Sequence, residues 1–248
     1  MEIELSIHDS VGRVTLNRPE VHNAISRSMW DALPGAMGSL AKQGARVIVV
    51  TGQGSSFASG ADLQELEQLS SYEEAREHWL SIRNALNAIA SFELPVVAAI
   101  NGPCLGGGCL LSIACDLRYC VPEAVFGIPA ALLGIVLDDD NIRRLVRLVG
   151  PANAAEMIFS GARLTAQKAQ SIALVQDVLP KGELEPFVMS LARRIKDNSA
   201  ESIRQTKISI GKACQSLSAG GQDEQDLQVS SYLSEEFRRR LEQSKVRD

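Results

Sequence analysis

Almost unbroken apolar runs and one helical repeat of apolar residues dominate the first half of the chain. Val47–Thr51 and Pro95–Asn101 have the pattern that is typical of strands buried on both faces. Four apolar residues recur at helical spacing within a helix predicted at about 72–91, namely Trp79, Ile82, Leu86 and Ile89. Because strands alternate with helices in this way, the pattern predicts an α/β core.

Shorter patterns predict the elements before those strands. Two β-prone runs at residues 3–7 and 11–16 are separated by polar turn residues, which predicts a hairpin. Ser26 stands where it can cap a helix that runs to about Ala41. Pro34 lies in the middle of that helix, where it removes a helical hydrogen bond.

The second half of the chain is mostly helical. A glycine turn leads into an apolar helix at about 108–115, and helical patterns dominate the later residues. Gly150-Pro151 predicts a break between two helices, because proline suits the first turn of a new helix. We therefore expect an α/β core over residues 1–185 and a helical region over residues 186–248.

Composition and charge exclude several classes of protein. The 248 residues are 45% hydrophobic with a net charge of −5, which is too apolar for a disordered chain and ordinary for a globular one. Aromatic residues make up only 4%, and the basic run at 238–240 is balanced by nearby glutamates, so no nucleic-acid surface is expected. No apolar run approaches the roughly 18 residues of a membrane span, and the N-terminus lacks a basic signal segment. We therefore expect a cytoplasmic protein that does not enter a membrane.

The cysteines form no metal-binding or disulfide pattern. They are odd in number, and no two of them have CxxC spacing: Cys104, Cys109, Cys115, Cys120 and Cys214. The chain has only three histidines, so a zinc site is not expected. We interpret the cysteines as small buried thiols in a reducing compartment.

Two glycine-rich junctions between a strand and a helix carry the candidate chemistry. Ser59–Asp62 follows the first buried strand, and Gly106–Gly108 follows the second. Each junction leaves free backbone N–H groups at the start of a helix, and glycine lets a ligand approach the backbone closely. Two such donors aimed at one point would form an oxyanion hole for a thioester enolate or a tetrahedral intermediate. Taken alone, either junction is also explained as a structural turn.

The junctions belong to a longer series of motifs in a fixed order: Asn17-Arg18-Pro19, Asn23-Ala24, FASGADL at 57–63, PVVAAINGPCLGGGC at 95–109, CDLRY at 115–119 and FGIP at 126–129. From about residue 3 to about residue 214, this series resembles the crotonase (enoyl-CoA hydratase/isomerase) family. The resemblance implies a spiral of ββα units, followed by a C-terminal helical region that mediates assembly into a homotrimer or a dimer of trimers. It also implies an acyl-CoA or acyl-carrier thioester substrate. Coenzyme A would enter only as part of that substrate, with no metal or redox cofactor.

Carried over by motif position, the resemblance implies which residues meet the thioester. The carbonyl oxygen would lie between the backbone N–H groups of Ala61 and Gly107, which form the oxyanion hole. Other positions would line the acyl, pantetheine and adenosine parts of the substrate: Val21, His22, Asp62, Leu63, Gln64, Gly106, Leu110 and Ala130.

Two of these positions depart from the family. Its hydratases carry one catalytic glutamate after the GGGC segment and another after the proline of FGxP, where this chain has Leu110 and Ala130. Leucine and alanine cannot accept a proton, so the usual mechanism with two carboxylates is excluded. In the dienoyl-CoA isomerase branch, a catalytic aspartate stands at the position that matches Asp138. Asp138 is therefore the predicted catalytic residue.

Alternatives stay open for both the residue and the function. Asp139 or Asp140 is expected to cap the following helix, where carboxylates favour the N-terminal dipole. The predicted enzyme stabilises a thioester enolate and acts as an isomerase, a hydratase or dehydratase of another kind, a decarboxylase or a hydrolase. The alternative is a non-catalytic CoA-ester-binding or scaffold protein, in which Asp138 faces solvent and Leu110 fills the acyl pocket.

Overall fold

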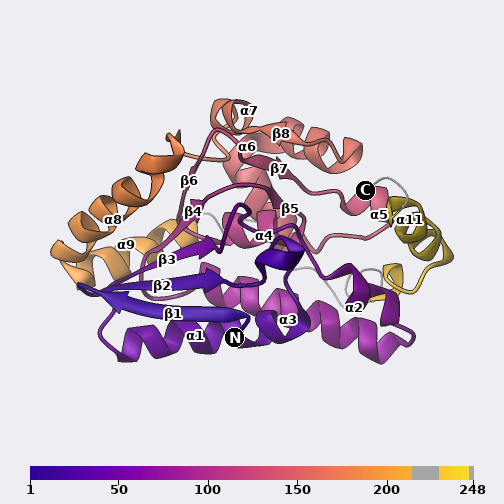
Figure 1. The fold of residues 1–248 in the computed structure, drawn as a ribbon, viewed down its shortest axis with the longest axis horizontal. Helices are drawn as coiled ribbons and strands as arrows, with labels where there is room; N and C mark the ends of the chain where they lie inside the picture. The colour runs from indigo at the N-terminus through magenta and orange to yellow at the C-terminus, as the bar shows by residue number, and fades with distance from the viewer. Residues whose placement is uncertain (214–228, 246–248) are drawn as a thin grey trace.

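The computed structural model describes residues 1–213 and 229–245, and its main feature is a six-stranded sheet. The predicted hairpin forms the edge of this sheet, with β1 (Ile3–His8) antiparallel to β2 (Val11–Leu16). The next strands run parallel to β2 in the order β3, β4, β6 and β9 (Figure 1). Their bounds are Val47–Gly52, Val96–Ile100, Leu117–Cys120 and Asp177–Val178. The two buried runs of the sequence are therefore neighbouring parallel strands, β3 and β4, and their carboxyl ends lie at the same edge of the sheet.

A small second sheet holds the glycine turn at Gly106. It contains β5 (Cys104–Leu105), β7 (Val125–Gly127) and β8 (Leu164–Thr165) in that order. Strands of two or three residues are too short for a periodic pattern, so the sequence did not predict this sheet. The N–H of Gly106 donates to the Gly127 carbonyl at 2.8 Å, which fixes the start of the turn.

Helices cover the sheets, with α1 and α3 packed together along one side (Figure 1). The bounds in chain order are η1 Pro19–Val21, α1 Arg27–Lys42, α2 Leu63–Gln68, α3 Tyr72–Ala90, α4 Gly107–Ala114, α5 Ala130–Leu133, α6 Asp139–Ser160, α7 Ala166–Ser171, α8 Lys181–Asp197, α9 Ala200–Ala213 and α11 Glu235–Lys245. The predicted cap of α1 is confirmed, because Ser26 Oγ accepts from Met29 N at 3.2 Å. α1 continues through Pro34, since burial of a face that includes Trp30 and Leu33 offsets one lost hydrogen bond. The predicted break in α6 is confirmed at Gly150, which has a φ of 76° and a ψ of 163°.

The main core lies between the six-stranded sheet and the helices around it. The strands β3 and β4 are buried on both faces, and Val47–Val50 are at most 1% exposed. Cys104, Cys109, Cys115 and Cys120 are free thiols buried in this core. Cys214 lies outside the described residues.

Arg118 is a charged residue inside this core. Its side chain is 2% exposed, and burial lowers the pKa of the guanidinium. The guanidinium donates to the carbonyl oxygens of Leu174 at 2.8 Å and Cys115 at 2.6 Å, and more distantly to Ser112 at 3.3 Å. Backbone carbonyls from two distant segments thus satisfy this buried charge.

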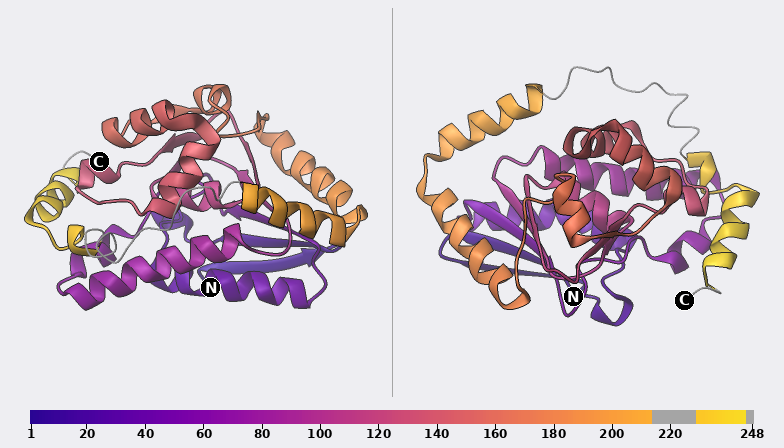
Figure 2. Two further views of the ribbon diagram at one scale, coloured as in Figure 1. Left: turned by 180° about the vertical axis from the view of Figure 1, so that it is seen from behind. Right: turned by 90° about the horizontal axis from the view of Figure 1, so that it is seen from above.

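The helices after β9 lie at opposite ends of the molecule. α8 and α9 extend at one end, and α11 packs against α5 and α2 at the other (Figure 2). The boundary predicted at residue 185 falls inside α8, whose Leu184 and Val188 pack into the main core. α9 contributes no buried residue, and Ile210 on it is 60% exposed. No helix in the described part of the chain combines the length and apolar character that crossing a membrane requires.

Candidate active site

The two glycine junctions lie against each other. Leu105, which precedes the second junction, donates its N–H to the carbonyl of Ala58 in the first at 2.9 Å. A Cβ built on Gly107 would lie 3.6 Å from the Ala61 nitrogen, and a Cβ built on Gly60 would lie 3.7 Å from the Gly107 nitrogen. The structure therefore brings together the two amides that the sequence predicts as an oxyanion hole.

Backbone conformation leaves these two amides available to a ligand. Gly60 has a φ of +124° and Gly106 a φ of +48°, which are values that favour glycine. Within residues 1–213 and 229–245, the N–H groups of Ala61 and Gly107 donate to no protein acceptor. Both residues are only partly buried. An oxygen atom of a ligand can therefore accept hydrogen bonds from this pair.

The loop that carries Ala61 is fixed to the segment before α1. Ile25 forms an isolated parallel bridge opposite Ala61. The Asp62 carboxylate caps α2 by accepting from Gln64 N at 3.0 Å, and it pairs with Arg18 Nη1 at 2.8 Å. The side chain of Asp62 is thus engaged in holding the loop that positions the Ala61 amide.

Further predicted substrate positions surround the same loop. Ser59 donates its N–H to the His22 carbonyl at 3.0 Å and its hydroxyl to the Val21 carbonyl at 3.2 Å. Val21 and His22 are exposed, as are Leu63 and Gln64 in the first turn of α2. The structure therefore places these four residues at the solvent-accessible side of the Ala61 loop.

The two positions at which the resemblance implies glutamates in the family's hydratases are apolar and buried here. Leu110 on α4 is 7% exposed, and Ala130 at the start of α5 is 8% exposed. Both belong to the main core. Neither can accept or donate a proton, so any proton transfer at this site must use other groups.

Asp138 caps α6, and the prediction that Asp139 or Asp140 provides this cap was wrong. Asp138 has extended backbone angles, φ −73° and ψ 153°, so its Oδ1 reaches Asn141 N at 3.0 Å. Its Oδ2 accepts from Asn141 Nδ2 at 2.6 Å, and the residue is 8% exposed. Asp140 lies two residues beyond the cap, inside the helix, and pairs with Arg143 at 3.0 Å. Each Asp138 oxygen still has an unused acceptor position, because a carboxylate oxygen accepts two hydrogen bonds.

A polar chain leads from Asp138 into the protein. Asn141 Oδ1 accepts from Arg144 Nη1 at 2.8 Å, and Arg144 also donates to Asn87 on α3. Burial lowers the pKa of Arg144, and the charges of Asp140 and Asp138 oppose this effect. The carboxylate of Asp138 is thus held in one orientation by a network that reaches α3.

A second apolar cluster lies beside the oxyanion loop. It joins α2 and α3 to the end of the chain and comprises Leu66, Ala75, Trp79, Val229, Tyr232, Phe237 and Leu241. Ala61, Leu133 and Ile135 pack against this cluster. The cluster therefore contacts both the loop of Ala61 and the segment that leads to Asp138.

His78 is a buried polar residue next to this cluster. It is 1% exposed, its ring lies 5.7 Å from the Tyr232 ring in an edge-on arrangement, and its Nε2 has no hydrogen-bond partner among the described residues. Burial, and to a smaller extent the charge of Arg27, lowers the pKa of His78 to about 4. The imidazole is therefore neutral at physiological pH.

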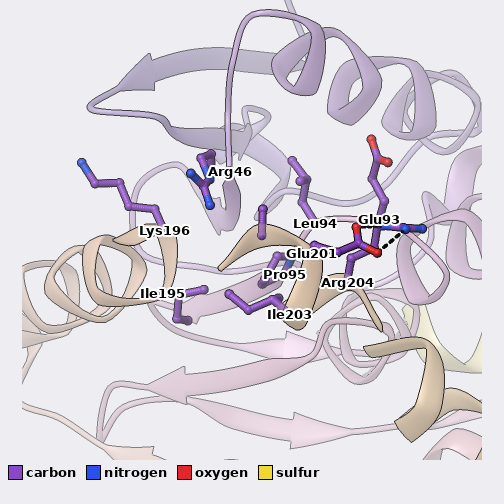
Figure 3. A pocket seen from close by; sticks show the side chains of 10 residues that line it. Arg46, Glu93, Leu94, Pro95, Ile195, Lys196, Glu201, Ile203 and Arg204 are labelled. Carbon is purple, nitrogen blue, oxygen red and sulfur yellow. Dashed lines mark hydrogen bonds and ion pairs between the residues drawn. The ribbon is translucent and has the colours of Figure 1, made fainter. Parts of the chain in front are cut away.

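The cavities at the other end of the molecule lie apart from these residues. One of about 200 Å³ lies between α8, α9 and the segment before β4, where Leu94 and Ile203 lie beside the Glu201–Arg204 ion pair (Figure 3). Another of about 240 Å³ lies between α8 and the strands β2 to β4. None of the predicted site residues lines either cavity. In the described ranges, no three histidine, cysteine, aspartate or glutamate side chains are grouped to share a metal ion.

Sequence reasoning missed two contributors to this arrangement. Trp30 packs behind the oxyanion loop, because a Cβ on Gly107 would lie 3.0 Å from its Cζ2. Tyr232 joins the site from the end of the chain, where no motif marks it. The position of Trp30 on the apolar face of α1 predicts that its side chain is buried. This position does not indicate that Trp30 contacts the loop of Gly107.

The comparisons with known proteins identify the family of the chain. The model of the family described as enoyl-CoA hydratase/isomerase matches residues 6–244. A peroxisomal Delta(3,5)-Delta(2,4)-dienoyl-CoA isomerase of Arabidopsis thaliana is 35% identical over 218 residues, which are 83% of this chain and 78% of that protein. A mitochondrial enoyl-CoA hydratase of Pongo abelii is 32% identical and covers 92% of this chain and 78% of its own length.

Solved structures give the same result. An enoyl-CoA hydratase/isomerase from Xanthobacter autotrophicus Py2 superposes with a TM-score of 0.89 at 26% identity, over 99% of this chain and 93% of the other. The fold defines an α/β protein of the crotonase class, as the sequence predicted. The chain belongs to the enoyl-CoA hydratase/isomerase family.

Proposed function

We propose that the protein is an enzyme that acts on an acyl-CoA or acyl-carrier thioester and moves a proton on its acyl group through an enolate. The backbone amides of Ala61 and Gly107 would hold the thioester oxygen as negative charge develops on it. Asp138 would serve as the proton-transferring group in place of the two missing glutamates. The reaction class that needs the fewest further groups is isomerisation of a carbon–carbon double bond.

The observation that carries this proposal is the contact between the two glycine junctions. The 3.6 Å between the Ala61 nitrogen and a Cβ built on Gly107 supports a pair of donors that one oxygen atom can reach. The absence of protein acceptors for these two amides in the described part of the chain supports a role in ligand binding. Preorganised backbone donors of this kind stabilise an oxyanion by about 3–4 kcal/mol each.

The environment of Asp138 supports its assignment over the non-catalytic alternative. The scaffold interpretation predicts that Asp138 faces solvent, whereas its side chain is buried at 8% exposure. Its carboxylate is oriented by two hydrogen bonds from Asn141, which leaves acceptor positions for a substrate proton. The 35% identical dienoyl-CoA isomerase adds support for isomerase chemistry.

A panel of thioesters tests the proposal. The purified protein is incubated with saturated, 2-enoyl, 3-enoyl and dienoyl-CoA esters, and each mixture is analysed by mass spectrometry with chromatographic separation of isomers. We expect conversion between double-bond isomers and no change in mass. Binding of CoA esters without conversion of any of them would instead support the non-catalytic alternative.

A further inference from the structure

Tyr232 lies where the end of the chain meets the segment that carries Asp138. The neighbouring Ser231 Oγ accepts from Val136 N at 3.1 Å, which ties the two segments together two residues before Asp138. Tyr232 is 7% exposed, and its ring meets those of His78 at 5.7 Å and Phe237 at 6.1 Å edge-on. The phenol is therefore held in one place by contacts on two sides.

The Tyr232 phenol is protonated at physiological pH, and it interacts electrostatically with the Asp138 carboxylate. Burial raises the pKa of Tyr232, and the negative charge of Asp138 raises it further. The same apolar cluster that contains Tyr232 also contacts Ala61. The neutral phenol of Tyr232 therefore belongs to the apolar cluster that contacts both Ala61 and Ile135, which precedes Asp138.

Isomerisation needs a proton to leave one carbon and another proton to reach a different carbon. Leu110 and Ala130 remove both glutamates that family hydratases use, so Asp138 would otherwise have to reach both carbons alone. A second proton-transferring group on the chain removes that difficulty.

We infer that Tyr232 is the proton donor that acts together with Asp138 on the acyl group of the thioester. This inference rests on the proposed function. The Asp138 carboxylate removes a proton from carbon, and the electron pair of the broken C–H bond moves into the thioester to form an enolate held by Ala61 and Gly107. The enolate then takes the phenolic proton of Tyr232 at a remote carbon, which leaves a phenolate.

The two groups return to their starting states without any other reactant. The phenolate of Tyr232 takes the proton that Asp138 gained, either directly or through one water molecule. Because burial disfavours the phenolate and a carboxylic acid is a much stronger acid than a phenol, this return is downhill. One proton is removed, one is delivered, and the acyl group changes only the place of its double bond.

Solvent deuterium separates the two steps experimentally. The protein is incubated in D₂O with the thioester that the panel identifies, and both deuterium uptake and isomer formation are measured by mass spectrometry. The variants are Tyr232→Phe and Asp138→Asn, with Tyr119→Phe as a matched control whose ring packs on Phe187 in another part of the fold. Tyr232→Phe keeps the ring and removes only the hydroxyl, so the fold and the binding of the thioester should be unchanged. Thermal unfolding and the Kd of the thioester are measured for each variant to check this.

We expect the wild-type protein and Tyr119→Phe to exchange deuterium and to form the isomer. Tyr232→Phe should retain deuterium exchange while isomer formation falls at least about 100-fold, and Asp138→Asn should lose both. Full isomer formation by Tyr232→Phe would overturn the inference. Loss of deuterium exchange or weakened thioester binding in Tyr232→Phe would also overturn it, provided that this variant unfolds at the wild-type temperature. If the wild-type protein neither exchanges deuterium nor converts any thioester, the proposed function fails, and the role of Tyr232 fails with it.

Discussion

Arg18 and Asp62 lie 44 residues apart in the sequence and form an ion pair of 2.8 Å beside the oxyanion loop. Their side chains are only 18% and 13% exposed, so solvent screens this pair less than a surface pair. Arg18 Nη1 also donates to the Ala24 carbonyl at 2.9 Å. The position of the Ala61 backbone amide therefore depends on a side-chain contact that joins two of the sequence motifs.

Removal of this ion pair should slow turnover more than it weakens binding. In Arg18→Met, the loop should lose one of its anchors, and kcat should fall about 10- to 100-fold because a displaced donor stabilises the oxyanion poorly. Steady-state kinetics on the active thioester give kcat and KM separately. Arg27→Met is the control, since its ion pair with Glu77 is 42% and 54% exposed and should contribute little. A rise in KM with unchanged kcat would contradict a positioning role for Arg18.

Asp138→Asn should abolish most turnover with little loss of stability. Asparagine still caps a helix, so the free energy of unfolding should fall by no more than about 1 kcal/mol, whereas turnover should fall at least about 100-fold. Asp140→Asn is the matched control, because it removes a neighbouring carboxylate that pairs with Arg143 and does not cap α6. Kinetics and chemical denaturation of both variants distinguish the roles. Equal turnover in the two variants would exclude Asp138 as the base.

The buried imidazole of His78 should make the fold sensitive to mild acid. Burial holds its pKa at about 4, below the ordinary value of 6.5, so the unfolded chain binds the proton more tightly than the folded protein. The free energy of unfolding should therefore fall as the pH decreases from about 6.5 to about 4, by up to roughly 3 kcal/mol from this group. Urea denaturation at several pH values should show a shallower pH dependence for His78→Gln over this range. His8→Gln, which changes an exposed histidine, should keep the wild-type slope.

The exposed face of α9 should be covered by another copy of the chain. Ile208 and Ile210 on this helix are 40% and 60% exposed in the single chain. Family resemblance implies a trimer or a dimer of trimers, which would bury such residues by closed symmetry. Ile210→Glu should shift the mass measured by light scattering toward the monomer, while Lys212→Glu on the same helix should not. A monomeric wild-type protein at micromolar concentration would contradict the prediction.

Much of the fold was predictable because its central elements carry strong local patterns. The buried strands β3 and β4 appear as continuous apolar runs. The cap at Ser26 and the break at Gly150 occur at residue types that favour the start or the end of a helix. The pairing of the two glycine junctions was implied by the resemblance to the crotonase family. The structure gives its physical basis, because the neighbouring parallel strands β3 and β4 end at one edge of the sheet. Nothing local in the sequence indicated the second sheet, since β5 and β8 are two residues long and β7 is three residues long.

The parts of the site that depend on long-range contacts could not be predicted. Three consecutive aspartates look alike in sequence, and only the backbone angles at Asp138 decide which of them caps α6. Tyr232 reaches the site through packing in a cluster with residues of α2, α3 and α11, which the polar sequence around it does not indicate. The burial of His78 likewise depends on the C-terminal residues that cover its helix.

The contacts of Arg118 constrain the order in which the polypeptide folds during its synthesis. Its guanidinium joins the Cys115 carbonyl to that of Leu174, which lies 56 residues after Arg118 in the chain. Until Leu174 has left the ribosome, this charge lacks one of its acceptors, so burying the guanidinium away from water would be unfavourable. The strands β1 to β6 are therefore expected to stay loosely packed on the ribosome and to consolidate together in one late event.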